Sequence, residues 1–164
     1  MRFFLLAACL LLLALTASAG LIGTDPPANL VVTRAGLDWV WASPCAAEQP
    51  SCGDGTLTLH HGYAIPTDAQ WLASFTSYTE VYKAFVDGTG AQKCASPYFD
   101  SGWTNCDSLD VAIGGIWHSP LADPAFREDP NADSFLVRGA VPEPSTYALI
   151  GLGLAALYAR RRRS

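Results

Sequence analysis

The stretch Leu37-Asp38-Trp39-Val40-Trp41-Ala42 decides the fold of this 164-residue chain. Its large side chains Leu37, Trp39 and Trp41 alternate with the residues between them, and a period of two is typical of a β-strand. We expect this strand to bury its aromatic face in the core. The same alternation recurs in Thr56-Leu57-Thr58-Leu59-His60, which we predict to be a second strand.

Two short helices are predicted after these strands. Pro66-Thr67-Asp68-Ala69-Gln70-Trp71 has the form of a helix start, with Thr67 as N-cap and Gln70 completing a capping box. We expect this helix to end near Phe75. A second box, Ser77-Tyr78-Thr79-Glu80, opens another helix, and its aromatic face, which we assign to the core, carries Tyr78, Tyr82 and Phe85.

The remainder of the central region is predicted to be rich in loops. From Gly88 to Gly115 we expect little regular structure apart from a strand at 111–113, and a last strand is expected at 134–138. These elements predict a small α+β domain over residues 20–140. A domain of about 120 residues buries a modest core, so it gains from disulfide bonds.

The N-terminus is typical of a secretory signal peptide. Arg2 supplies a positive charge, residues 3–15 are apolar, and Ala17-Ser18-Ala19 is a small-residue cleavage site. We predict a signal peptide over residues 1–19, removed on export. A lipoprotein signal ending at Cys9 is the alternative, but the apolar run continues past that cysteine.

The C-terminus holds three short segments in a fixed order. A proline-containing motif comes first, made of Val141, Pro142, Glu143, Pro144, Ser145 and Thr146. An apolar stretch, 147–159, follows, and the chain then closes with the basic residues Arg160, Arg161, Arg162 and Arg163. Thirteen helical residues span about 20 Å, so we predict a short single-pass helix whose arginines stay on the cytoplasmic side.

These three segments together resemble the PEP-CTERM sorting signal, a segment that is also labelled an ice-binding protein C-terminal domain. The resemblance covers residues 141–164 and implies that an exosortase, a membrane-embedded cysteine transpeptidase, processes the tail near Pro142-Glu143-Pro144. It further implies transient anchoring in the inner membrane, followed by release or attachment at the cell surface. It leaves the role of the exported domain open.

Four cysteines fall within the exported domain, and an even number in an exported chain predicts two disulfides. Three pairings are open. We favour Cys45 with Cys52 and Cys94 with Cys106, because each pair closes a short loop. A zinc site is the alternative, but its usual ligand spacing is absent here, and we predict no bound metal or cofactor.

The order of several segments resembles C-type-lectin-like domains of bacterial surface proteins. The segments are Gly36-Leu37-Asp38-Trp39, the Pro66-Thr67 helix start and Phe135-Leu136-Val137-Arg138. The calcium-and-sugar motif of those lectins is absent. The resemblance therefore bears on the expected fold and implies no ligand.

Acidic residues dominate the exported domain. Residues 20–140 contain fourteen acidic residues against five basic ones, a net charge of −9, so we predict no nucleic-acid partner. Asp129-Pro130-Asn131-Ala132-Asp133 opens like a calcium loop, but Ser134 and Ala140 break the EF-hand pattern, which leaves a calcium site of another kind as an alternative. A second oxygen-rich patch, interpreted as a solvated loop, contains Asp100, Asn105, Asp107 and Asp110.

The sequence lacks the common catalytic motifs for nucleophilic, zinc-dependent and phosphate chemistry. We therefore predict a non-catalytic surface or extracellular-matrix protein of the biofilm. Its exposed aromatics Trp103 and Trp117 are predicted to contact exopolysaccharide or neighbouring surface proteins. The alternative is a small secreted hydrolase that acts on the same polysaccharide.

Overall fold

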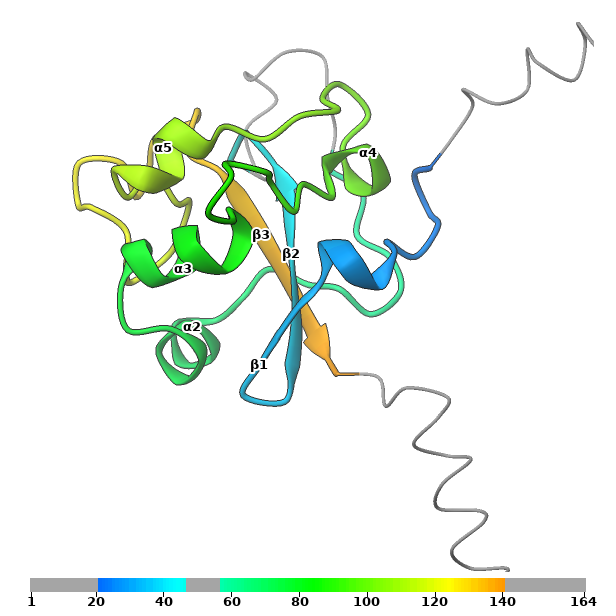
Figure 1. Ribbon diagram of the computed structural model, residues 1–164, viewed down its shortest axis with the longest axis horizontal. Helices are drawn as coiled ribbons and strands as arrows, with labels where there is room; N and C mark the ends of the chain where they lie inside the picture. Colours follow the sequence, from blue (N-terminus) through cyan, green and yellow to red (C-terminus); the bar gives the residue numbers. More distant parts are fainter. Residues whose placement is uncertain (1–20, 47–56, 141–164) are drawn as a thin grey trace, which may run out of the picture.

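A three-stranded antiparallel sheet runs through the centre of the molecule (Figure 1). The computed structural model describes residues 21–46 and 57–140, so the predicted signal peptide, Cys52 and the C-terminal sorting segments lie outside the described residues. The strands are β1 (Val32–Arg34), β2 (Leu37–Ser43) and β3 (Ser134–Gly139), in the order β1-β2-β3. The strand predicted around Trp39 is thus the central one.

The hairpin between β1 and β2 follows from two residues with left-handed backbone. Ala35 has a φ of 51° and Gly36 a φ of 73°, which matches the two-residue turns that suit the twist of antiparallel strands. The turn sets Arg34 opposite Leu37 and Val32 opposite Trp39. On the other side of β2, Trp41 lies opposite Phe135, and the register shifts between Trp41 and Ser43.

Strand β2 is buried on both faces, whereas the sequence pattern predicted one buried face. Helices α2, α3 and α5 lie on one side of the sheet and α4 on the other (Figure 1). The side chains of Trp39 and Trp41 pack into the first layer, and those of Val40 and Ala42 pack into a second cluster with Phe99 of α4. The second layer explains the difference, because residues far along the chain cover the face that was expected to meet water.

The two predicted helices are confirmed with their caps. Helix α2 spans Asp68–Ser74, and Thr67 and Gln70 form the complete capping box. Helix α3 spans Tyr78–Phe85, with the Ser77 side chain accepting from the Glu80 amide. Phe85 is fully buried, while Tyr78 and Tyr82 are partly buried against the same core.

Two predicted strands are wrong. Of the segment predicted as 56–60, the described part forms a single bridge from Leu57 to Asp100, and a bridge alone makes no strand. The segment 111–113 belongs mainly to helix α5 (Ser108–Ala112), because the Asp107 side chain caps that helix by accepting from the Leu109 amide at 2.9 Å. The strand predicted at 134–138 is confirmed as β3.

The main core is an aromatic cluster between β2, β3 and the helices. Trp39 and Trp71 have ring centroids 4.6 Å apart, and Trp41 stacks on Phe135 at 5.5 Å. Trp71 also meets Phe135 edge-on at 5.7 Å, which joins α2 to β3. These large rings give the small domain a well-packed apolar core.

A disulfide fastens the loop-rich segment to this sheet. Cys94 and Cys106 are bonded with their Cα atoms 5.7 Å apart, which confirms that predicted pair. The closed loop contains the short helix α4 (Ser96–Phe99) and Trp103. It is also held to β2, because Cys94 bridges Trp41 and the Ala95 amide donates to the Trp41 carbonyl at 2.8 Å.

Cys45 is disulfide-bonded as well. Its predicted partner Cys52 lies outside the described residues. Within the described ranges, no helix is both long and apolar enough to span a bilayer. The single-pass helix predicted at 147–159 is likewise outside them.

Candidate functional site

Two adjoining cavities, of about 230 and 190 Å³, lie where the disulfide loop and α5 meet the segment 126–131. Both have Asp110 and Asn131 in their walls, and we call the pair the acidic groove. The larger cavity is completed by Gly115, Phe126, Asp129 and Ala132. The smaller one is completed by Pro44, Trp103, Asn105 and Asp107.

Trp103 reaches the groove from the disulfide loop. Its amide donates to Asp100 Oδ1 at 3.1 Å, and its carbonyl accepts from the Ser96 hydroxyl at 2.8 Å. Asp100 is itself buried and accepts from the Ser43 hydroxyl at 2.6 Å, so the loop is tied to the end of β2. The prediction of a solvated loop is therefore wrong for Asp100, which anchors Trp103.

Helix α5 carries the carboxylates of one wall. Asp107 caps the helix and Asp110 follows one turn later, so the two lie on the same side of α5. The chain then turns sharply at Gly114, whose φ is 89°. A Cβ there would lie 2.8 Å from the Asp123 amide nitrogen, and this close approach requires glycine.

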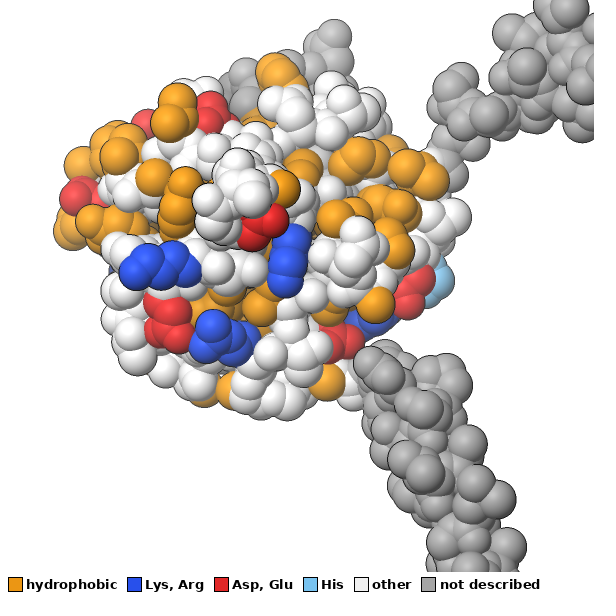
Figure 2. Space-filling model, viewed as in Figure 1, with side chains coloured by type: hydrophobic (Ala, Val, Ile, Leu, Met, Phe, Trp, Pro, Cys, Tyr) orange, Lys and Arg blue, Asp and Glu red, His pale blue; other side chains and the backbone are white. Residues whose placement is uncertain are grey.

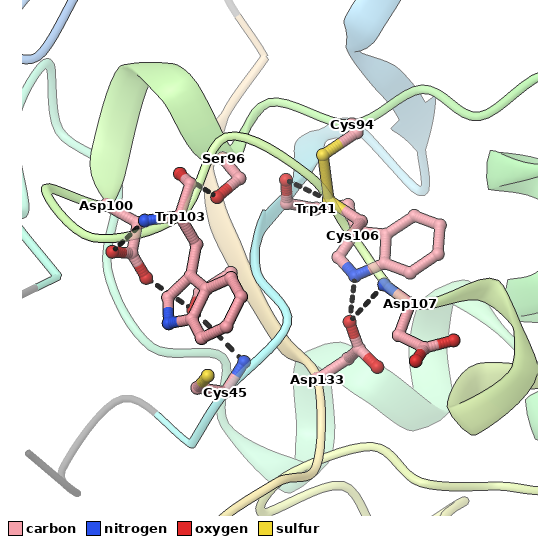
Figure 3. Close-up of a disulfide and its surroundings, with 10 residues drawn as sticks. Trp41, Cys45, Cys94, Ser96, Asp100, Trp103, Cys106, Asp107 and Asp133 are labelled. Carbon is pink, nitrogen blue, oxygen red and sulfur yellow. Dashed lines mark hydrogen bonds between the residues drawn. A yellow bond between two sulfur atoms is a disulfide. The ribbon is translucent and has the colours of Figure 1, made fainter. Parts of the chain in front are cut away.

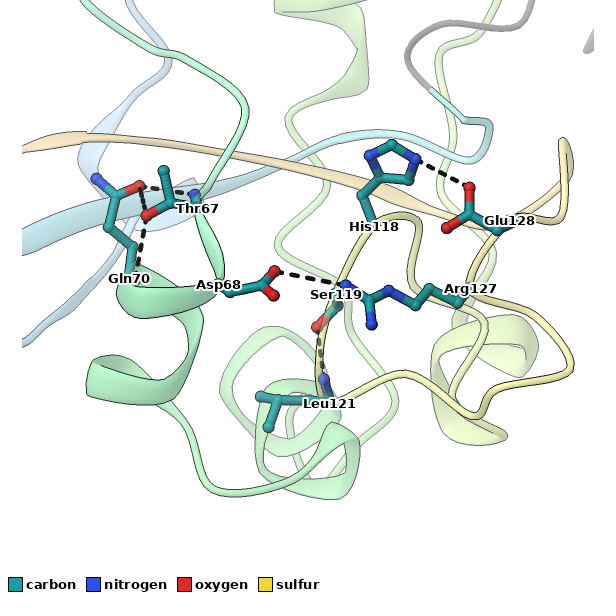
Figure 4. A network of polar contacts seen from close by, with 8 residues as sticks. All are labelled: Thr67, Asp68, Gln70, His118, Ser119, Leu121, Arg127 and Glu128. Atoms are coloured by element: carbon teal, nitrogen blue, oxygen red, sulfur yellow. Dashed lines mark hydrogen bonds and ion pairs between the residues drawn. The ribbon is translucent and has the colours of Figure 1, made fainter.

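The opposite wall is the segment 126–131, and polar contacts hold it in place. Asp129 Oδ1 accepts from the backbone amide of Asn131 at 2.8 Å and from its side-chain amide at 3.1 Å. Arg127 pairs with Asp68 at the start of α2 at 3.5 Å, and His118 contacts Glu128 at 3.0 Å (Figure 4). Both pairs are largely exposed and so contribute little stability, but they orient the wall.

Negative charge is concentrated in the groove. Burial raises the pKa of Asp110 above its ordinary value, and the neighbouring carboxylates Asp107 and Asp129 raise it further. In the described part of the chain, none of the residues that line either cavity is Lys, Arg or His. The groove therefore has a negative potential that its own residues do not balance.

A buried carboxyl lies behind this wall. Asp133 has no exposed surface, and its Oδ1 accepts from the Trp41 indole at 2.7 Å and from the Asp107 amide at 3.4 Å (Figure 3). Its Oδ2 is buried without a hydrogen-bond partner among the described residues. Burial raises the pKa of Asp133 well above the usual aspartate value.

The two tryptophans predicted to bind ligand differ in their exposure. Trp103 is half-buried and lines the smaller cavity. Trp117 is 6% exposed and packs with Ala46 and Ala132, so the expectation that it is exposed is wrong. The reason is that its amide donates to the Asp133 carbonyl, which holds it against the residues leading into β3.

The calcium-like loop does not gather its side chains around one point. Asp133 points inward to Trp41, whereas Asp129 bonds to Asn131 within the groove wall. In the ranges 21–46 and 57–140, no group of three or more His, Cys, Asp or Glu residues is placed to hold a metal ion. The side-chain oxygens of Asp129 and Asp133 therefore lie apart instead of converging on one point.

Sequence reasoning named many of the groove residues but did not bring them together in one site. It singled out Asp107 and Asp110 as a surface patch and Asp129 as part of a different loop. The signal that could have united them is weak, since it needs the long-range contact that the Ile116–Asp133 bridge makes. Pro44 and Phe126 carried no signal at all.

An apolar surface lies next to the groove. Leu109 of α5 is 76% exposed and Ile113, one turn further on, is 51% exposed. Figure 2 shows hydrophobic side chains gathered on the upper left of the molecule, in the region of α5. The acidic residues of α5 thus lie beside the exposed apolar side chains of Leu109 and Ile113.

Comparison with known proteins places the chain among proteins with a C-terminal sorting signal. The family model that matches is the PEP-CTERM protein-sorting motif, over residues 140–163. The match confirms the resemblance to the PEP-CTERM sorting signal and implies an exosortase as processing partner, with export and membrane-anchored transit before surface display. No curated protein and no solved structure matches the chain, so the similarity to C-type-lectin-like domains stays a prediction.

Proposed function

We propose that the exported domain is a non-catalytic surface or extracellular-matrix protein that binds exopolysaccharide of the biofilm in the acidic groove. The observation that carries this proposal is the composition of the groove. An indole, Trp103, stands beside amide and carboxyl groups on the walls of one cavity. Indole rings pack against the apolar faces of sugars, and amides and carboxylates hydrogen-bond hydroxyl groups.

The size of the groove supports a small ring as the bound unit. Each cavity is smaller than the roughly 300–1,000 Å³ of pockets for drug-sized ligands, and the two adjoin at Asp110 and Asn131. Successive units of a chain would thus occupy neighbouring cavities. The sorting motif supports the same function, because it delivers the domain to the surface where polysaccharide is found.

The test is a titration of the exported protein, purified from the surface of the producing cells, with exopolysaccharide from the same cells. We expect Trp103→Ala to weaken binding by at least about tenfold, as loss of an aromatic anchor does, and Trp103→Phe to retain most of it. Leu72→Ala is the control, since Leu72 is 61% exposed on α2 and lines neither cavity. Equal binding by Trp103→Ala and the wild type would contradict the proposal.

The alternative function, a secreted hydrolase, is favoured by one observation. Asp110 has a raised pKa beside Asp107 and Asp129, which is the pattern of a general acid next to an ionised carboxylate in glycosidases. Incubation with the exopolysaccharide and assay of new reducing ends separates the two functions. Release that Asp110→Asn abolishes would establish the hydrolase and replace the binding proposal.

A further inference from the structure

The acidic groove has a charge pattern that restricts its ligand. Three carboxylates, Asp107, Asp110 and Asp129, line the two cavities, and each cavity contains Asp110. In the described part of the chain, no group donates a hydrogen bond to the Asp110 side chain. A cation between these carboxylates would be attracted by all three, whereas an anionic sugar would be repelled by all three.

The buried carboxyl of Asp133 is a second, independent feature that points to the same ligand charge. Figure 3 shows its unpartnered Oδ2 turned toward the side chain of Asp107, which lines the smaller cavity. Both Asp107 and Asp110 act electrostatically on Asp133, so the three carboxyl groups lie within a short range of one another. A positive charge bound at Asp107 and Asp110 would relieve the repulsion between these two carboxylates.

The distribution of these groups favours an organic cation over a metal ion. Among the residues described, no three acidic, His or Cys side chains converge tightly enough to hold a metal. The carboxylates are instead spread along the groove, with the indole of Trp103 and the ring of Pro44 at one end and Phe126 at the other. Carboxylates that are spread between apolar side chains fit an oligosaccharide in which positive groups are separated by sugar rings.

We propose that the acidic groove binds a polysaccharide whose sugars carry free amino groups, so that successive ammonium groups pair with the carboxylates along the groove, Asp107, Asp110 and Asp129, while one ring packs against Trp103. Asn105 and Asn131 supply side-chain amides for the hydroxyl groups. This inference rests on the proposed function and adds the chemical class of the sugar. A basic protein segment would share the charge, but the cavities are sized for rings and their amides match hydroxyls.

The experiment compares two probes that differ at one group. Glucosamine hexamers and their fully N-acetylated counterparts are titrated into the exported protein at low and high salt. We expect the free-amine hexamer to bind at least about tenfold more tightly, and this advantage to shrink as salt screens the charges.

Two carboxamide variants locate the effect. Asp110→Asn and Asp129→Asn remove charge while keeping shape, and each is expected to weaken binding of the free-amine hexamer more than binding of the N-acetylated hexamer, so that the preference for the free amine falls. Asp87→Asn is the matched control, because Asp87 lies in the turn after α3, lines neither cavity and accepts hydrogen bonds that asparagine can also accept. Its preference should equal that of the wild type.

The outcomes distinguish the two proposals. Equal binding of the two hexamers would overturn the inference about amino sugars and leave the polysaccharide-binding function in place. Binding of neither hexamer, together with no binding of the cells' own exopolysaccharide, would overturn both. Binding of oligolysine but of no sugar would show a site for basic protein segments and would also overturn both.

Discussion

The aromatic half of the domain and the groove segment are stabilised in different ways. The first is built from β2, α2 and α3, where interlocking rings and two capped helices bury the core. The second, residues 94–133, contains the short helices α4 and α5, and its buried apolar residues Phe99, Val111 and Ile116 are supplemented by a disulfide, side-chain bonds to backbone and one buried carboxyl. The scaffold thus depends mainly on apolar contact, while the segment that carries the candidate site depends on apolar contact together with polar and covalent ties.

The strongest test of the aromatic half is Trp71→Ala. Trp71 is 1% exposed and contacts Trp39, Phe75 and Phe135. Loss of so large a buried ring should lower the free energy of unfolding by about 3–5 kcal/mol, because it leaves a cavity that the structure cannot fill. Denaturant unfolding followed by tryptophan fluorescence and circular dichroism measures the effect. A loss below about 1 kcal/mol would mean that this core is less tightly packed than its geometry indicates.

The next largest effect should come from the double substitution of Cys94 and Cys106 by serine. Without the bond the unfolded chain gains conformational entropy, and for a loop of this length the free energy of unfolding should fall by about 3 kcal/mol. We expect faster hydrogen exchange at amides of residues 94–107, with much smaller changes in α2 and α3. Uniform acceleration through both halves would show that the two are not separable.

The buried carboxyl predicts a pH dependence of stability. Because the pKa of Asp133 is raised in the folded state, the folded protein binds its proton more tightly than the unfolded chain does. The wild type should therefore lose stability as pH rises from about 4, the unfolded aspartate value, through the folded pKa.

The variant Asp133→Asn keeps an acceptor for the Trp41 indole but removes the charge. Relative to the wild type, it should gain free energy of unfolding as pH rises from about 4 to neutral, because it has no carboxyl to ionise in the core. Chemical unfolding of both proteins at several pH values gives the difference. A difference that stays constant across this range would contradict the assignment to Asp133.

The smallest effect should come from Thr67→Ala at the start of α2. Loss of the capping box should lower the free energy of unfolding by about 1 kcal/mol. The affinity of the groove for its ligand should not change. Thr67→Ser, which keeps the hydroxyl, is the matched control and should cost only a few tenths. Equal losses in the two variants would show that the methyl group, rather than the cap, matters at this position.

Local chemistry made the capped helices predictable. Thr67 and Ser77 are N-caps whose partners lie three residues further on, so the two helix starts could be predicted without any distant contact. Strands β2 and β3 were predictable from alternation and apolar content. In contrast, residues 111–113 were assigned to a strand because the cap at Asp107 was not recognised as a helix start.

The groove was beyond sequence reasoning for a physical reason. Its walls come from two segments about twenty residues apart, and they meet because Asp133 and Ile116 pair in a bridge. Trp103 was recognised as a candidate, but Trp117 looked the same in sequence and is buried. The difference between the two depends on tertiary packing, which a single sequence does not encode locally.

Strand β3 is the last element of the described fold, and it completes the sheet. It pairs along β2 from Leu37 to Ser43 and ends at Gly139, while the sorting motif begins at residue 140. If the chain crosses the membrane from its N-terminus, β3 is therefore the last strand to emerge, and the sorting segment follows directly after it. The sheet can therefore be completed only when the residues directly before the sorting segment have crossed the membrane, so folding ends just before sorting can begin.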